Sequence, residues 1–223
     1  IEFKKTRIVI DPWLNGDLIF PLGGWFFKGT LKDEIPTPED IDLILLTQGL
    51  PDHCHIPSLK KFPKKTNIIC SKSAYKILNE LNFKSINIMQ PGQNLKFNEI
   101  EIEATSGAAV PQIENGYILE TNEGSFYVEP HGFLDNTIKP RKLDAVITPT
   151  KNLELPIVGP FVKGADVIPN LIKLFNPSYI LSSTTGGDAK FSGILNSFIS
   201  LEEYKKAIDC KILDLDQMQS VVI

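Results

Sequence analysis

Residues 47 to 55 read Thr-Gln-Gly-Leu-Pro-Asp-His-Cys-His, and this short stretch decides how the rest of the sequence is interpreted. It follows a largely apolar run, residues 41 to 46, of the kind found in strands that are buried on both faces. It precedes Ile56-Pro57-Ser58-Leu59, which suits the start of a short helix. Two of the three histidines in the chain fall here, beside Asp52. Side chains that bind metals or transfer protons are therefore concentrated where a buried strand ends, and we expect any chemistry at this place.

The composition indicates one folded domain. The chain has 223 residues, enough for a substantial core, and nothing in this length requires a second domain. Hydrophobic residues make up 42% and charged residues 22%, which is ordinary for a globular protein. The formal net charge is −4, and Arg7 and Arg141 are the only arginines, a balance that argues against a nucleic-acid surface. We expect a single domain over residues 1–223 that binds no nucleic acid.

The three cysteines, Cys54, Cys70 and Cys210, have no paired spacing, and an odd number fits a reducing compartment better than a disulfide framework. The sequence therefore predicts a cytoplasmic protein. No apolar stretch approaches the roughly 20 residues that span a bilayer, and the first residues lack the order of a signal peptide. Because the chain does not begin with Met, we expect the true start to lie upstream.

Periodicity predicts strands and helices in two halves. In the first half, strands at residues 67–70 and 86–89 flank a helix at 73–81, and from Pro91 the pattern becomes antiparallel. The second half predicts helices at 165–175, near 189–199 and at 201–208, and strands at 179–182 and 211–215. The total is about ten strands and about five helices, with no Pro/Ser-rich linker. Two mixed sheets stacked face to face, with helices outside, account for the hairpins better than a doubly wound parallel sheet.

Two further features lie before the motif. A strand ends at Asp11, which either lies over a site at the sheet edge or opens an Asx turn before Pro12. Residues 13–29 carry five aromatic side chains among glycines and prolines. This segment predicts a long loop that either packs on the core or covers a pocket as a flap.

The strand, the loop ending in Asp-His and the short helix that follows resemble the metallo-β-lactamase superfamily. Members with a hydrolytic site carry His-x-His-x-Asp-His at this place. Ile10-Asp11-Pro12 and the closing strand are also similar to the ascorbate-6-phosphate lactonase-like branch. The resemblance covers nearly the whole chain and implies a four-layer αββα sandwich of two mixed β-sheets with helices on the outer faces.

The motif departs from the family pattern in the first metal site. Aligned on Asp52 and His53, Gln48 and Leu50 replace the first two histidines, and Ala108 stands where the third is expected. Leucine and alanine offer no donor atom, and glutamine offers only a weak amide oxygen. We therefore expect this first metal site to be empty.

Asp52, His53 and His131 remain, and the resemblance implies that this Asp/His/His set holds one divalent metal ion, either zinc, iron or manganese. A hydrolase of esters, lactones or phosphoesters would then use Asp52 and His53 as catalytic residues. Two alternatives stay open. In one, no metal binds and the same side chains form a pocket for a small-molecule ligand. In the other, the site is vestigial and residues 13–29 dock a protein partner.

The other candidate ligand-binding residues are Asp11, Gln48, His55, Glu129, Thr184 and Thr185. Glu129 or His131 falls near the position of the family's bridging Asp, and Thr184 and Thr185 near that of its last histidine. His55 is either a surface histidine close to a helix start or a ligand-binding residue. Cys54 is expected to be a small buried residue and not a nucleophile. No glycine-rich phosphate loop follows a strand, so no substrate class is indicated.

Overall fold

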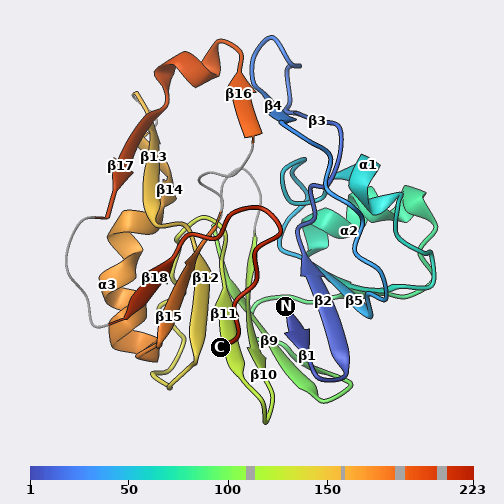
Figure 1. Cartoon of the computed structure of the whole chain (residues 1–223), viewed down its shortest axis with the longest axis vertical. Helices are drawn as coiled ribbons and strands as arrows, with labels where there is room; N and C mark the ends of the chain where they lie inside the picture. Colours follow the sequence, from blue (N-terminus) through green and yellow to red (C-terminus); the bar gives the residue numbers. More distant parts are fainter. Residues whose placement is uncertain (109–113, 157–158, 184–188, 205–209) are drawn as a thin grey trace. The chain divides into compact units, whose positions relative to one another are not determined.

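The computed structural model describes residues 1–108, 114–156, 159–183, 189–204 and 210–223 (Figure 1). These residues form two compact units. The first unit holds residues 1–90, 114–115 and 189–197, and the second holds the other described residues. Both units are assembled from several chain segments. The expectation of a single domain over residues 1–223 stays a prediction.

A five-stranded sheet organises the first unit. Its order is β1-β2-β5-β6-β7, with β1 antiparallel to β2 and the other neighbours parallel. The strands are β1 (Glu2–Phe3), β2 (Thr6–Ile10), β5 (Leu43–Leu46), β6 (Asn67–Cys70) and β7 (Ile86–Ile88). The helices of this unit are α1 (Ile56–Leu59) and α2 (Lys72–Leu78), which continues as the 3₁₀ turn η1 (Asn79–Leu81). The strands and helices predicted here are confirmed to within a few residues.

Strand β5 is buried on both faces, as its apolar sequence predicts. Ile44 and Leu46 pack into a core with α1 and α2, the two helices drawn beside β2 and β5 in Figure 1. Leu43 and Leu45 point to the opposite face of the pleat and are also fully buried. Thr47, which follows β5, is thereby held at the carboxyl end of a rigid central strand.

A small second sheet in the first unit corrects the prediction of a loop at residues 13–29. Its order is β16-β4-β3, made of β3 (Asp17–Ile19), β4 (Lys28–Leu31) and β16 (Ala189–Ser192). Both pairings are antiparallel. Strand β4 is thus paired with a segment about 160 residues later in the chain, a distance over which local sequence patterns carry no information.

A seven-stranded sheet organises the second unit, in the order β18-β15-β12-β11-β10-β9-β8. The β8/β9 and β10/β11 pairs are antiparallel, and β11, β12, β15 and β18 run parallel. The strands are β8 (Asn94–Phe97), β9 (Ile100–Ser106), β10 (Asn115–Glu120), β11 (Ser125–Val128), β12 (Ala145–Thr148), β15 (Tyr179–Ser182) and β18 (Lys211–Leu213). A separate sheet has the order β14-β13-β17, with β13 (Lys151–Leu155), β14 (Gly159–Lys163) and β17 (Ser200–Glu203).

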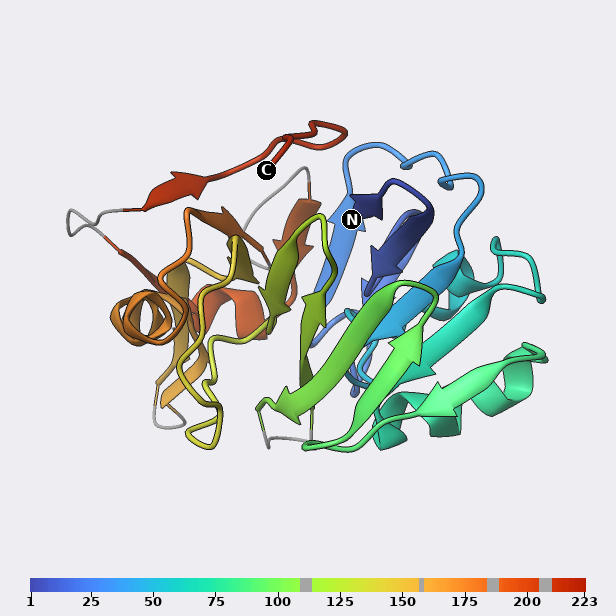
Figure 2. The same cartoon turned by 90° about the horizontal axis from the view of Figure 1, so that it is seen from below.

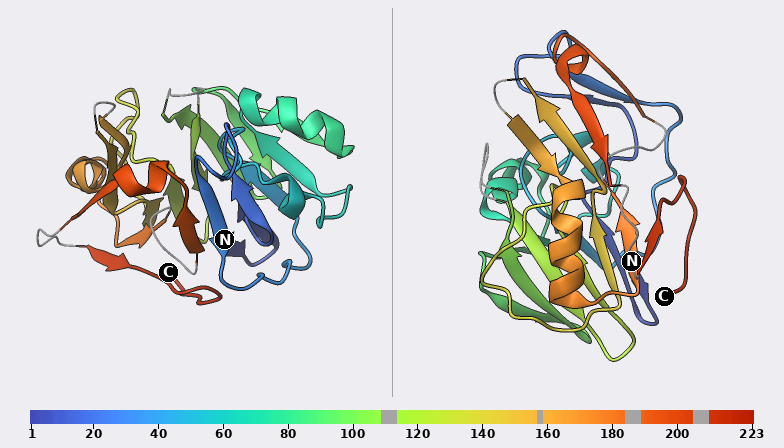
Figure 3. Two further views of the ribbon diagram at one scale, coloured as in Figure 1. Left: turned by 90° about the horizontal axis from the view of Figure 1, so that it is seen from above. Right: turned by 90° about the vertical axis from the view of Figure 1, so that its left-hand side faces the viewer.

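Helix α3 (Gly164–Phe175) covers one face of the seven-stranded sheet. Figure 2 shows it end-on, and the right-hand view of Figure 3 shows it lying along the strands. Val167, Ile168, Leu171 and Phe175 recur at helical spacing and form the buried stripe that packs on the sheet. Asn176 ends the helix in the left-handed conformation. The helix predicted at residues 165–175 is confirmed.

The two helices predicted near residues 189–199 and at 201–208 are wrong. Residues 189–192 form β16, residues 195–198 form the 3₁₀ turn η2 (Leu195–Phe198), and residues 200–203 form β17. Gly193 between them has φ of 101°, which no α-helix allows. Pairing of β16 with β4 and of β17 with β13 overrides the helical spacing of the apolar residues. Residues 205–209 lie outside the described residues.

Gly49 provides a test of how the loop that carries the motif, residues 47–55 (the motif loop), packs on α2. A Cβ at this position would lie 2.7 Å from the backbone oxygen of Ser73, and the Gly49 N–H donates to Ser73 Oγ at 3.0 Å. Gly49→Ala should therefore lower the free energy of unfolding by about 1–3 kcal/mol through overpacking. Gly124→Ala is the control, because its Cβ would meet only ordinary contacts. Equal urea midpoints for the two variants would contradict this packing.

Candidate metal centre

The motif loop is closed by its own backbone. His53 N–H and Cys54 N–H both donate to the carbonyl of Leu50, at 3.0 and 2.7 Å. Ser71 N–H donates to the carbonyl of Leu46, which ties the end of β5 to the start of α2. These bonds turn the chain sharply after β5, so that Asp52 and His53 follow the sheet edge directly.

Asp11 binds the motif across the ends of two neighbouring parallel strands. Its Oδ1 accepts from Thr47 N–H at 2.9 Å, and its Oδ2 accepts from Thr47 Oγ1 at 2.6 Å. The same Oδ2 lies 2.9 Å from His53 Nδ1, which is also 3.1 Å from Thr47 Oγ1. Of the two interpretations of Asp11, a group lying over the site fits these contacts, and Thr47 is a site residue that the sequence analysis did not single out.

His53 is almost completely buried between two carboxylates. Its Nε2 lies 3.2 Å from Asp52 Oδ2, opposite the contact with Asp11. Burial lowers the pKa of the imidazole, but the charge of Asp52 and the hydrogen bond and charge of Asp11 outweigh burial and raise the pKa well above its ordinary value. A doubly protonated ring donates Nδ1–H to Asp11 and forms an ion pair with Asp52 on its Nε2 side. A metal ion on Nε2 would take the place of the second proton.

The pair formed by Asp52 and His53 fits a metal ion. Two donor atoms about 2.1 Å from a tetrahedral zinc lie about 3.4 Å apart. The 3.2 Å between His53 Nε2 and Asp52 Oδ2 is close to that spacing. The contact of Nδ1 with Asp11 matches the way metal-binding histidines are oriented, by a carboxylate on the other ring nitrogen.

Gln48, which stands in place of the first family histidine, is buried and makes one charged contact. Its Nε2 donates to Glu114 Oε1 at 3.0 Å. Glu114 is fully buried, and the sequence analysis missed it. The contact spans 66 positions of the chain, and no motif marks Glu114.

His55 is buried, so the interpretation as a surface histidine is wrong. Its Nδ1 lies 2.8 Å from Ser58 Oγ and its Nε2 lies 3.3 Å from the carbonyl oxygen of Asp17. Ser58 Oγ also accepts from Leu14 N–H and lies 3.2 Å from Asn15 Oδ1. His55 thereby ties α1 to the segment before β3, and its predicted ligand-binding role stays a prediction.

Cys54 is buried, as predicted for a small core residue. Burial, together with the charge of Asp11, raises the pKa of its thiol to about 12. A thiol that holds its proton so firmly is a poor nucleophile. Cys54, Cys70 and Cys210 are all free cysteines, in agreement with the absence of a predicted disulfide framework.

Glu129 and His131 belong to the second unit, at the carboxyl end of β11. Both are buried. Glu129 Oε2 accepts from the backbone N–H groups of His131 and Phe133, at 3.2 and 2.7 Å. Gly132 has φ of 74° and packs directly on the backbone of Lys163 and Gly164. Glu129 thus shapes the turn that presents His131.

The remaining positions predicted from the family resemblance are considered one by one. Ala108 is buried and offers no donor, as expected. Thr184 and Thr185 lie outside the described residues. Asp52 and His53 belong to the first unit and His131 to the second, so the grouping of these three as metal ligands stays a prediction.

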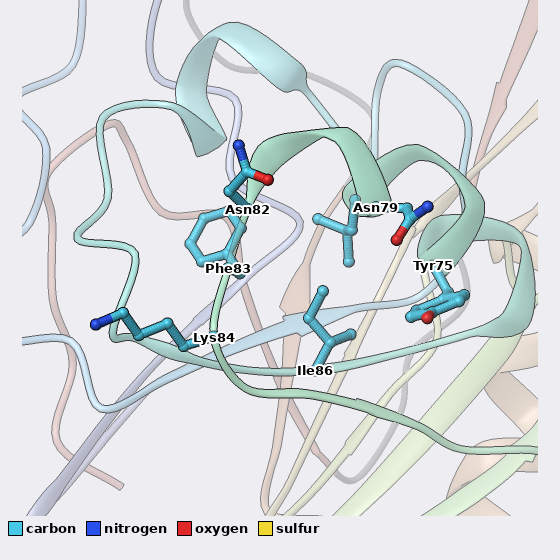
Figure 4. Close-up of a pocket in the computed structure, with 7 residues that line it drawn as sticks. Tyr75, Asn79, Asn82, Phe83, Lys84 and Ile86 are labelled. Atoms are coloured by element: carbon cyan, nitrogen blue, oxygen red, sulfur yellow. The ribbon is translucent and has the colours of Figure 1, made fainter.

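A hollow in the described surface of the first unit lies away from these residues. Figure 4 shows it in the first unit, beside α2 and η1, with Tyr75, Asn79, Asn82, Phe83, Lys84 and Ile86 around it. Its volume is about 360 Å³, and no predicted site residue lines it. Among the residues that the structure describes, no helix combines the length and apolar character needed to cross a bilayer.

A family model described as a beta-lactamase superfamily domain matches residues 1–183 of the chain. This match confirms the predicted superfamily, whereas the lactonase-like branch stays a prediction. A comparison with curated proteins finds no match.

Several solved structures share the fold. The isothiocyanate hydrolase from Delia radicum gut bacteria is 14% identical with a TM-score of 0.61, and the match covers 82% of this chain and 79% of that one. A "possible metal-dependent hydrolase" from Veillonella parvula DSM 2008 is 18% identical with a TM-score of 0.61, covering 82% and 80%. A mutant of the CmlA beta-hydroxylase, a diiron enzyme from Streptomyces venezuelae, is 15% identical with a TM-score of 0.63, covering 84% and 44%. The chain thus spans less than half of CmlA. These likenesses confirm the predicted mixed α/β sandwich class.

His55 provides a pH-dependent test. Burial lowers its pKa, and the hydrogen bond to the Asp17 carbonyl opposes this only in part. A buried neutral imidazole contributes stability that is fully present above the unfolded pKa of about 6.5 and is lost as the pH falls through the folded pKa. His55→Gln should therefore lose less unfolding free energy than the natural chain between about pH 7.5 and about pH 5 in urea titrations.

His53 does not confuse this comparison. Its pKa is raised, so its contribution to stability is fully present below about pH 6.5 and is lost as the pH rises through the raised pKa. Because the natural chain and His55→Gln both carry His53, this contribution cancels in the comparison. An equal loss of stability in the natural chain and in His55→Gln on acidification would contradict the buried neutral state of His55.

Proposed function

The chain belongs to the beta-lactamase superfamily, and from this premise we propose that it is a hydrolase that uses one divalent metal ion. The metal ligands in this proposal are Asp52, His53 and His131. Zinc, iron and manganese all accept such a set. The contact between Asp11 and His53 Nδ1 carries the proposal, because it directs Nε2 of the ring to the side where Asp52 lies.

The proposed reaction is the addition of water across the C–O bond of an ester or lactone, or the P–O bond of a phosphoester. A bound divalent metal supplies Lewis-acid activation of water and of the substrate oxygen. Asp52 orients the attacking water or accepts its proton, and Asp11 and Thr47 keep His53 in one tautomer. The similarity of Ile10-Asp11-Pro12 to the lactonase-like branch supports a lactone within this substrate class.

The proposed ligand-binding residues around the metal are Gln48, His55, Glu129, Thr184 and Thr185, with Asp11 behind His53. The hydrolases among the structures of similar fold support the reaction class only at the level of the fold. The three free cysteines support a reducing, cytoplasmic location as part of the proposal.

Metal content tests this function directly. Protein purified without chelator should hold close to one zinc, iron or manganese ion per chain, measured by plasma mass spectrometry. Asp11→Asn should weaken zinc affinity about 10–100-fold, because the amide no longer offers two acceptor oxygens to Thr47 and His53. Asp17→Asn is the matched control, since Asp17 bonds Lys28 and Thr30 instead. Occupancy of a few per cent would rule out the metal-dependent function.

A docking function is the second candidate, and one observation favours it. Leu22 and Trp25 are 69% and 65% exposed, and Ile194, whose N–H donates to the Trp25 carbonyl, is 55% exposed. The rings of Phe20, Phe27 and Phe191 pack together within the same segments. A firmly held apolar surface of this kind is typical of a protein-binding site. If no metal binds, the same polar residues would instead form the pocket for a small ligand.

The docking surface has its own test. Trp25→Ser should abolish affinity capture of a partner while leaving the melting temperature nearly unchanged, because the side chain is already in solvent. Ile88→Ser is a control, since Ile88 is also exposed but lies on β7. Equal capture by the natural chain and Trp25→Ser would contradict docking through this surface.

A further inference from the structure

The segment between α1 and β7 is strongly basic in a chain that is acidic overall. Residues 60–84 hold seven lysines and one acidic residue, Glu80, whereas the whole chain has 23 basic and 27 acidic residues. Several lysines elsewhere pair with carboxylates. Within residues 60–84 only Lys61 has such a partner, Glu34, among the residues that the structure describes. A local excess of positive charge of this kind attracts anions.

Lys64 carries a shielded ammonium group with no anion beside it. Its Nζ is closed off from solvent and has no hydrogen-bond partner in the described part of the chain. It lies 4.2 Å from the centre of the Phe83 ring, a cation–π contact that replaces only part of the lost hydration. Burial and the charge of Lys60 both lower the pKa of this ammonium. An anion at Lys64 would oppose both effects.

Lys64 stands next to the hollow beside α2 and η1. The ring of Phe83, over which the ammonium lies, also lines this hollow, and so does Lys84. The Lys84 N–H donates to the carbonyl of Lys64 at 2.9 Å, so the two lysines are neighbours in space. Figure 4 shows Phe83 and Lys84 at one end of the hollow and Tyr75 at the other. Both positive charges therefore belong to one end of the hollow.

The remainder of the hollow suits a small polar molecule. Leu78 and Phe83 in its wall are buried, whereas Tyr75, Asn79 and Asn82 around it are exposed. Each asparagine amide can both donate and accept hydrogen bonds, and the tyrosine ring offers a face for stacking. The volume of about 360 Å³ lies at the lower end of the range for small-molecule sites. The hollow therefore has the size of one small molecule.

We propose that this hollow binds a small phosphate monoester, such as a sugar phosphate or a nucleoside monophosphate, with its phosphate group at Lys64 and Lys84. An ammonium binds phosphate as a compact point charge, and the flexible stem of the exposed Lys84 lets it follow the group. Asn79 and Tyr75 then contact the hydroxyl groups or the ring of the ligand. The inference goes beyond the proposed hydrolysis, because no residue placed in the metal centre lines the hollow.

Isothermal titration calorimetry of the whole chain at low ionic strength tests the binding, with ribose 5-phosphate and AMP as probes. At least one of the two should bind with a dissociation constant below about 1 mM. Inorganic phosphate and the matching compound without phosphate, ribose or adenosine, should each bind at least about 10-fold more weakly, because each engages only one end of the hollow. Added salt should weaken binding of the ester, since the phosphate contacts are ionic.

The variants assign the binding to the two ends of the hollow. Lys64→Met removes the ammonium but keeps most of the side-chain length, so affinity for the ester should fall at least about 10-fold. Asn79→Leu should weaken binding of the ester and leave binding of inorganic phosphate unchanged. Lys76→Met is the matched control, because Lys76 belongs to the same basic segment but does not line the hollow. If Lys64→Met does not fold, the exposed Lys84→Gln decides in its place.

Three results would overturn the inference. The first is that neither ester binds, and the second is that the natural chain, Lys64→Met and Lys84→Gln bind the ester equally well. The third is that phosphatidylserine vesicles bind the chain and neither ester does, which would make the basic segment a membrane-contacting surface instead. None of these results bears on the metal-dependent function, which metal content tests separately.

Discussion

The first unit depends on one carboxylate, that of Asp11, which joins the ends of two neighbouring parallel strands. It accepts from the backbone and side chain of Thr47 and contacts His53 Nδ1, so one side chain fixes both the start of the motif loop and the orientation of its histidine. Asp11 itself has φ of 43°, an unusual conformation for a residue with a Cβ that aspartate tolerates better than most. Strain at this position is compensated by three hydrogen bonds.

The same constraint explains why the departures from the family motif leave the orientation of His53 unchanged. Replacing two histidines by Gln48 and Leu50 removes donors from one place but leaves the Asp11 contact, which orients His53, intact. A buried histidine between carboxylates attracts a positive charge, and either a second proton or a metal ion can supply it. The electrostatics thus favour a cation at His53 Nε2 whatever happens at the neighbouring positions.

The spacing of apolar residues predicted strands and helices correctly where one face of the element is buried in the core. The strand at 67–70 and the helix at 73–81 were predicted because apolar residues recur with the period of their structure. The segment 189–203 was mispredicted as helical because its apolar residues also have helical spacing, although its backbone pairs with β4 and β13. Hydrogen bonds to distant strands decided its conformation, and no local pattern encodes such pairing.

In the candidate site, too, the local sequence determined some features, and contacts between residues far apart in the chain decided the others. The sequence by itself determined that Asp52 and His53 lie at the end of a buried strand, because the apolar run and the motif are contiguous. It left the role of Asp11 open and gave no sign of Glu114. Only the tertiary structure decided these, because Asp11 reaches His53 across a parallel strand pair and Glu114 reaches Gln48 across 66 residues. Contacts made through space, and not along the chain, give the motif its orientation and its buried partner.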